Sequence, residues 1–107
     1  MFELKVVTYF AAAHQLKMVA QKCENLHGHN WKIEVCVTSE KLSHAGIVMD
    51  FGDLKQNVKD IMTRLDHKFL NELEDFHNGN PPSSENIARY IAKSLQKEIR
   101  EPSIRVS

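Results

Sequence analysis

Two segments of this chain alternate between apolar and polar side chains, and this period limits what the chain can fold into. In the first segment, residues 2–10, one mostly apolar face is formed by Phe2, Leu4, Val6, Thr8 and Phe10. In the second, residues 31–38, the apolar positions are Trp31, Ile33, Val35 and Val37. A period of two residues is that of a strand with one buried face. We therefore predict two half-buried strands, the first ended by residues 11–14.

Two later segments have helical spacing. The first follows a short extended segment at 46–51, has Asp50 or Asp53 as its N-terminal cap, and places apolar side chains at Leu54, Val58, Ile61, Met62 and Leu65. The second begins near residues 83–85, ends before Pro102 and carries a stripe of Ile87, Ile91, Leu95 and Ile99. Residues 103–107 read as another strand. This order predicts an α+β fold, with a small antiparallel sheet and two helices on one face.

Length and charge exclude several classes of protein. The chain has 107 residues, and 14 Lys and Arg balance 14 Asp and Glu. We expect one domain over 1–107, with no nucleic-acid partner because a basic surface is missing. No apolar run is long enough to span a membrane, and the N-terminal residues do not resemble a signal peptide. With two Cys, a disulfide framework is not expected, and a cytoplasmic location fits.

Three histidines stand close to the two strands. His14 follows the first strand, whereas His27 and His29 precede the second. Residues i and i+2 of an extended chain point to the same face, so the last two rings can converge on one ion. Three His ligands with an open fourth position are typical of catalytic zinc sites. The spacing therefore favours zinc over three unrelated histidines.

Cys23 lies just before this pair of histidines. The spacing leaves three roles open for its thiol. It could close a structural site as a fourth ligand, be an inert buried thiol, or act as a catalytic thiolate. Glu24 beside it could be only a loop charge. Cys36 lies in the middle of a strand and is expected to be a small core residue.

Two carboxylates and one more histidine are candidate functional residues, but each could also be explained by its position at the end of a helix. Asp66 and His67 lie at a helix end, where a histidine complements the helix dipole; a carboxylate-tuned general acid is the functional reading. Taken alone, the dipole reading is favoured. Glu85 lies in the first turn of the second helix, where the dipole favours a carboxylate without any function.

Five motifs in order resemble the 6-pyruvoyltetrahydropterin synthase family over the whole chain. They lie at residues 10–14, at Cys23 with 27–29, and at 49–51, 65–71 and 82–86. Three residues separate Cys23 from His27, which resembles the bacterial and archaeal 6-carboxytetrahydropterin synthases of the queuosine (deazaguanine) pathway. The biopterin-forming branch has a longer gap. The Cys23-Glu24 pair resembles members that also cleave dihydroneopterin triphosphate to a hydroxymethyl-dihydropterin for folate.

The resemblance implies a role for each matching residue. His14, His27 and His29 would hold zinc. Cys23 would be the general base, with Glu24 as a second base, and Asp66 with His67 would relay a proton. Glu85 would hold the pterin, and Ser83 or Ser84 would supply a hydroxyl beside it. The candidates for binding the triphosphate are Lys17, Lys22, Arg64 and Lys68.

The resemblance also implies a reaction and an assembly. The expected enzyme is a lyase that forms 6-carboxytetrahydropterin from dihydroneopterin triphosphate, a small-molecule substrate. The alternatives are the hydroxymethylpterin product, 6-pyruvoyltetrahydropterin, and a non-enzymatic structural zinc module. The implied tunnelling fold (T-fold) closes three subunit sheets into a barrel, and two trimers form a homohexamer. The family has a pterin-anchoring Glu on its last strand beyond the position of Ser107, so we expect either that the chain is truncated there or that this anchor is missing.

Overall fold

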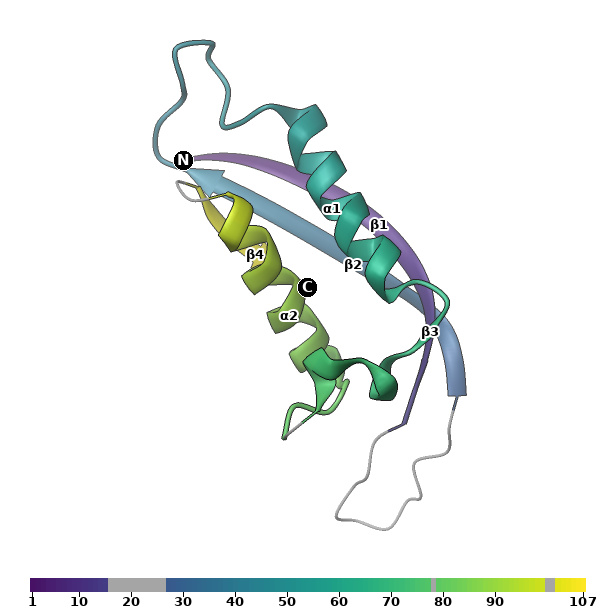
Figure 1. Cartoon of the computed structure of the whole chain (residues 1–107). Coiled ribbons are helices and arrows are strands. Elements are labelled where there is room, and N and C mark those ends of the chain that lie inside the picture. The colour runs from purple at the N-terminus through teal and green to yellow at the C-terminus, as the bar shows by residue number, and fades with distance from the viewer. Residues whose placement is uncertain (16–26, 78, 100–101) are drawn as a thin grey trace.

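The computed structural model describes residues 1–15, 27–77, 79–99 and 102–107, with the backbone but not the side chain of His27 (Figure 1). The elements, in chain order, are β1 (Phe2–His14), β2 (His27–Ser39), α1 (Phe51–Leu65), β3 (Lys68–Phe69), the 3-10 turns η1 (Leu70–Glu72) and η2 (Glu74–Phe76), α2 (Ser84–Glu98) and β4 (Ser103–Val106). Both predicted helices and all three predicted strands are present.

The largest element pair of the fold is formed by the long antiparallel strands β1 and β2. Its register runs from Phe2 opposite Ser39 to His14 opposite His27. The alternating segments predicted these strands, but β1 extends beyond its expected end, because residues 11–14 continue the same ladder. The two strands therefore bring the histidines at their far ends together, although 12 intervening residues separate His14 from His27.

Two short strands complete a four-stranded sheet in the order β3-β1-β2-β4. β4 pairs antiparallel with β2, and Ser107 continues the contact through two backbone hydrogen bonds with Glu34. β3 pairs in parallel with Ala12 and Ala13 of β1. The sheet is thus mixed, whereas an antiparallel sheet was expected. A two-residue strand has no detectable period of its own, so the sequence did not reveal β3.

Both helices pack on the same face of the curled sheet (Figure 1). The core joins the inward side chains of β1 and β2 to the apolar stripes of α1 and α2, including Leu54, Leu65, Ile91 and Leu95, all 0% exposed. Asp50 caps α1, because its carboxylate accepts the backbone N–H of Asp53 at 2.9 Å. Residues 46–49, expected to be extended, instead form a bend before this cap.

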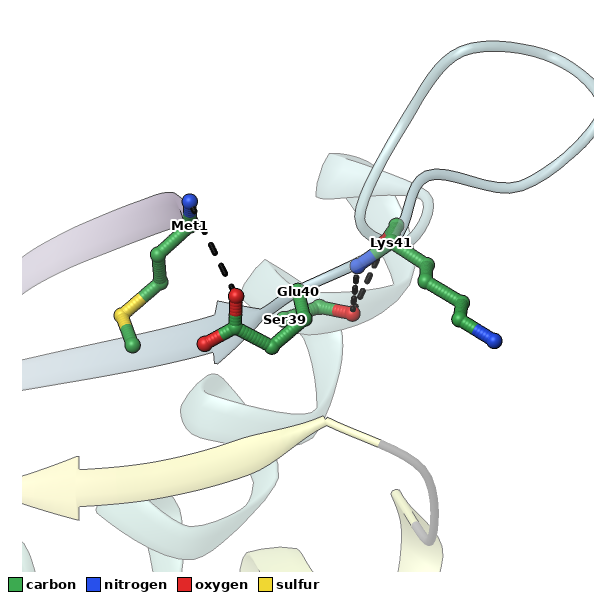
Figure 2. A network of polar contacts seen from close by, with 4 residues as sticks. All are labelled: Met1, Ser39, Glu40 and Lys41. Atoms are coloured by element: carbon green, nitrogen blue, oxygen red, sulfur yellow. Dashed lines mark hydrogen bonds and ion pairs between the residues drawn. The ribbon is translucent and has the colours of Figure 1, made fainter.

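The opposite face of the sheet is lined with charges. Lys5 lies 3.1 Å from Glu34, and Arg105 lies 3.6 Å from Glu3. At the end of β2, the hydroxyl of Ser39 donates to the carbonyl of Lys41 and accepts its N–H, and Glu40 forms an ion pair with the amino group of Met1 (Figure 2).

Within the described parts of the chain, no helix is long and apolar enough to cross a membrane.

Candidate metal-binding and active site

Two imidazoles face each other at the far end of the long hairpin. His14 ends β1 and is 6% exposed, and His29 lies on β2 opposite Ala12. The strand register places the two rings beside each other, with 3.4 Å between their Nε2 atoms. Two nitrogens bound to one tetrahedral zinc at about 2.0–2.1 Å stand about 3.3–3.4 Å apart. The observed separation therefore fits two ligands of one zinc ion.

Both rings are oriented through their other nitrogen. Nδ1 of His14 lies 2.8 Å from the carbonyl oxygen of Pro82, and Nδ1 of His29 lies 3.2 Å from that of Asn30. A carbonyl only accepts, so each Nδ1 donates its proton and each Nε2 carries the lone pair that a metal needs. This is the usual support for histidine ligands in metal sites.

The remaining predicted residues of this cluster lie outside what the structure describes. The side chain of His27 and the whole of Cys23 and Glu24 belong to that set, although the backbone of His27 pairs with His14. Among the described side chains, no group of three His, Cys, Asp or Glu forms a metal cluster. Two of the three predicted zinc ligands are therefore placed together, and the third remains a prediction.

Asp66 and His67 follow α1 and are fixed against β1. One carboxylate oxygen of Asp66 accepts the N–H of Ala11 at 2.8 Å, and the other lies 2.9 Å from Nδ1 of His67. The N–H of Ala11 lowers the pKa of Asp66 most, and His67 lowers it further. His67 is 82% exposed and has a positive φ of 58°, which turns the chain from α1 into β3. These contacts tie the Asp66–His67 pair to β1, and its catalytic role stays a prediction.

One depression joins His67 to His29, one of the two facing imidazoles. It has a volume of about 570 Å³ and is lined by residues 11–13, 28–30 and 67–69. His29 lies on one side and His67 on the other, because β3 docks on β1 directly beside the end of the hairpin. A ligand in this depression would contact both. Lys68, one of the triphosphate candidates, also lines it, whereas Arg64 lies over the ring of Tyr90.

The predicted pterin-binding residues stand at the start of α2. Ser83 is the N-terminal cap, and its hydroxyl accepts the N–H of Asn86 at 3.1 Å. Ser84 and Glu85 are exposed in the first turn, and none of the three lines the depression described above. The neighbouring Pro82 is buried and accepts the Nδ1 proton of His14, so this turn is linked to the end of the hairpin where His14 and His29 face each other.

The structure adds contributors that sequence reasoning missed. The amide of Asn71 forms two hydrogen bonds with the backbone of Gln15, at 2.8 and 2.7 Å, immediately after His14. Trp31 contacts both imidazoles through its ring. Asn71 ends a recognised motif and could have been suspected, but a backbone carbonyl such as that of Pro82 has no sequence signal. Cys36 is buried, as predicted.

Comparison with known proteins places the chain in a family. The sequence profile of 6-pyruvoyl tetrahydropterin synthase matches residues 3–107. A Synechocystis 6-carboxy-5,6,7,8-tetrahydropterin synthase is 39% identical over 93 residues, covering 82% of this chain and 70% of that protein. A Pyrococcus furiosus dihydroneopterin monophosphate aldolase is also 39% identical, over 84% of this chain and 71% of its own length.

The fold agrees with this assignment. The structure of Caenorhabditis elegans 6-pyruvoyl tetrahydropterin synthase matches with a TM-score of 0.81 and 27% identity, over 99% of this chain and 87% of that one. The tunnelling fold expected from the sequence is therefore confirmed for the subunit. By profile, relatives and fold, this chain is an enzyme of the 6-pyruvoyl tetrahydropterin synthase family.

Proposed function

We propose that this enzyme converts 7,8-dihydroneopterin triphosphate to 6-carboxy-5,6,7,8-tetrahydropterin, with release of acetaldehyde and triphosphate. The products together equal the substrate plus one water, so the reaction needs no external oxidant or reductant: the ring gains the electrons that the side chain loses. The proposal places the chain in queuosine precursor synthesis. The name of the Synechocystis relative supports it, at 39% identity over 82% of the chain.

One observation carries the proposal: the aspartate-oriented His67 shares a depression with His29, and the ring of His29 faces that of His14. The Nε2 atoms of His14 and His29 stand 3.4 Å apart, and His67 lines the same hollow as His29. Such a set offers a metal ion and a proton donor to one small molecule. A purely structural zinc module would not need an exposed imidazole held by a carboxylate beside the facing histidines, as His67 is by Asp66.

We assign zinc to His14, His27 and His29. When bound, zinc would supply Lewis acidity to the hydroxyls of the substrate side chain. Cys23 would remove a proton from that side chain, and His67 would return one. Asp66 fixes Nδ1 of His67, so that Nε2 points away from this contact and exchanges the proton. Glu85, with Ser83 or Ser84, would hold the pterin, and Lys68, which lines the depression, is the first candidate for binding the triphosphate.

A second outcome is favoured by the Pyrococcus relative, whose name gives it an aldolase activity on dihydroneopterin monophosphate. For this chain the corresponding product is 6-hydroxymethyl-7,8-dihydropterin, a folate precursor, with Glu24 as the base. A carboxylate is a weaker base than a thiolate unless its pKa is raised. Cys23→Ala should keep part of this activity, whereas Glu24→Ala should abolish it and leave carboxypterin formation.

Product analysis tests the proposal directly. The purified protein is incubated with dihydroneopterin triphosphate, and pterin products are identified by mass spectrometry. The carboxypterin with acetaldehyde is the expected outcome. A dominant hydroxymethyl or pyruvoyl product would overturn the assignment in favour of the folate-type or biopterin-type synthase.

Metal analysis tests the zinc site. Protein purified without added metal should contain about one zinc per chain, and His27→Ala should lose it. Full zinc occupancy in that variant would contradict the three-histidine site. Cys23→Ala should keep zinc and lose carboxypterin formation, whereas loss of zinc would support a closed structural site in which Cys23 is the fourth ligand.

We also propose a trimer-based homo-oligomer, most simply a hexamer, with the subunit sheets joined into a barrel, and a cytoplasmic location. The free outer edge of β1 supports the assembly: within the described residues, β3 covers this strand only at Ala12 and Ala13. An unpaired strand edge favours pairing with another chain.

A further inference from the structure

Trp31 lies next to the facing imidazoles and in contact with both. It follows His29 by two residues on β2, so both side chains belong to the same face of the sheet. The centroid of its ring lies 4.2 Å from that of His29, at a tilt of 33°, and 4.8 Å from that of His14, edge to face at 76°. The indole therefore covers one side of the pair.

The indole is itself held by groups other than these histidines. Its Nε1–H donates to the carbonyl of Ala12 at 3.4 Å, and the ring of Phe10 is nearly parallel to it, at 5° and 5.9 Å between centroids. Trp31 is 8% exposed, and Phe10 is its direct partner across the β1–β2 ladder. The strand pairing fixes the indole before any ligand binds.

The residue opposite His29 fits this arrangement. Ala12 is paired with His29 in the ladder and stands between Phe10 and His14 on β1. Its methyl group is small, so the large indole can reach diagonally across it to His14. Diagonal neighbours offset by two residues are within the reach of aromatic side chains. Trp31 and His14 are offset by four residues, and the ring contact at 4.8 Å shows that the indole spans this longer offset.

We propose that Trp31 is a positioning residue that holds the rings of His14 and His29 in the orientation for metal binding. This inference rests on the proposed metal site. Each imidazole is fixed at Nδ1 by a carbonyl and along its face or edge by the indole, so little ring rotation remains. Pre-organised ligands lose less entropy when the metal binds, and supporting groups of this kind typically change metal affinity by about 10–100-fold.

The wild-type protein offers a direct test, because Trp31 is the single tryptophan of the chain. Metal-free protein is titrated with Co²⁺ while the fluorescence emission of Trp31 is recorded. The amount of bound Co²⁺ is measured separately by equilibrium dialysis. We expect saturable quenching with the same stoichiometry as binding. Co²⁺ that binds without changing Trp31 emission would overturn the inference. If the protein binds neither Co²⁺ nor Zn²⁺, the proposed metal site itself fails, which is a different result.

Variants test the positioning role. Zinc affinity is measured by competition with a chelator for wild type, Trp31→Leu and Trp31→Phe. We expect Trp31→Leu to bind zinc about 10–100-fold more weakly and Trp31→Phe to recover most of that loss, since it keeps an aromatic face. Leu95→Ala is the matched control: it removes a buried side chain in the last turns of α2, away from the hairpin end.

Circular dichroism confirms that each variant is folded before the comparison. Wild-type zinc affinity in folded Trp31→Leu would contradict the positioning role. If Leu95→Ala lowers zinc affinity as much as Trp31→Leu does, the loss is due to general destabilisation. That result would also contradict the positioning role of Trp31. Should Trp31→Leu not fold, the Co²⁺ titration of the wild-type protein and the Trp31→Phe affinity decide the question.

Discussion

His67 has a backbone conformation that few side chains adopt readily. Its φ of 58° is in the left-handed region, where most residues other than Gly cost about 1–2 kcal/mol and Asn less. We predict that His67→Asn keeps the fold and the melting temperature but lowers carboxypterin formation by about 10²–10⁴-fold, the usual contribution of a general acid or base. Thermal unfolding and product assays check this. Activity within threefold of wild type would contradict the role of His67, whereas His67→Ala confounds catalysis with backbone strain.

Asp66 links stability to pH. The N–H of Ala11 and then His67 lower its pKa below the ordinary value of 3.8, so the native state favours the carboxylate. Its contribution to stability is complete above that ordinary value and is lost as the pH falls through the lowered one. Wild type should therefore exceed Asp66→Asn in urea midpoint at pH 6, and the difference should shrink below pH 3.8. Glu34, on the opposite face, also has a pKa lowered by its hydrogen bond with Lys5, so Glu34→Gln is a positive comparison whose difference from wild type should likewise shrink at low pH. A difference that is constant with pH would refute the linkage.

At the scale of elements, α2 depends on one cap. The hydroxyl of Ser83 accepts the N–H of Asn86, whereas Ser84 is exposed in the first turn. We predict that Ser83→Ala lowers the free energy of unfolding by about 0.5–2 kcal/mol. The control Ser84→Ala should stay within about 0.5 kcal/mol of wild type. Denaturant unfolding measures both, and equal losses would mean that the cap is not specific to Ser83.

The segment between α1 and α2 is held to β1 by side chains that act as strand partners. Asp66 binds the N–H of Ala11 at one end of β3, and Asn71 binds both backbone groups of Gln15 at the other. Asn71→Ala removes two hydrogen bonds and should lower the free energy of unfolding by about 1–3 kcal/mol. Asn80→Ala, in an exposed turn, should change it by less than about 0.5 kcal/mol. Urea unfolding of the pair tests this. A loss no larger for Asn71 than for Asn80 would show that these bonds do not stabilise β1.

For the whole molecule, the uncovered edge of β1 leads us to expect an oligomer. The outer side of β1 from Phe2 to Phe10 has no strand partner among the described residues, and Val7 and Tyr9 are 45% and 62% exposed. Such an edge attracts another strand unless it is covered. We predict a trimer-based oligomer, and sedimentation equilibrium at micromolar concentration should show a mass of three or six chains. A monomer with full activity would contradict the barrel.

The sequence alone determined the two long strands, both helices with their approximate starts, and the family, whereas the structure chose Asp50 over Asp53 as the cap of α1 and identified Ser83 as the cap of α2. The features that the sequence determined repeat over many residues or form ordered motifs, so local chemistry is enough to identify them. It also selected His14 and His29 together, because strand pairing follows from the alternation. The tertiary structure decided what depends on contacts between distant segments: the parallel pairing of β3, the carbonyl of Pro82 on His14, the amide of Asn71 on Gln15, and the shared depression of His29 and His67. Backbone atoms and two-residue strands leave no residue pattern, so only the fold could place them.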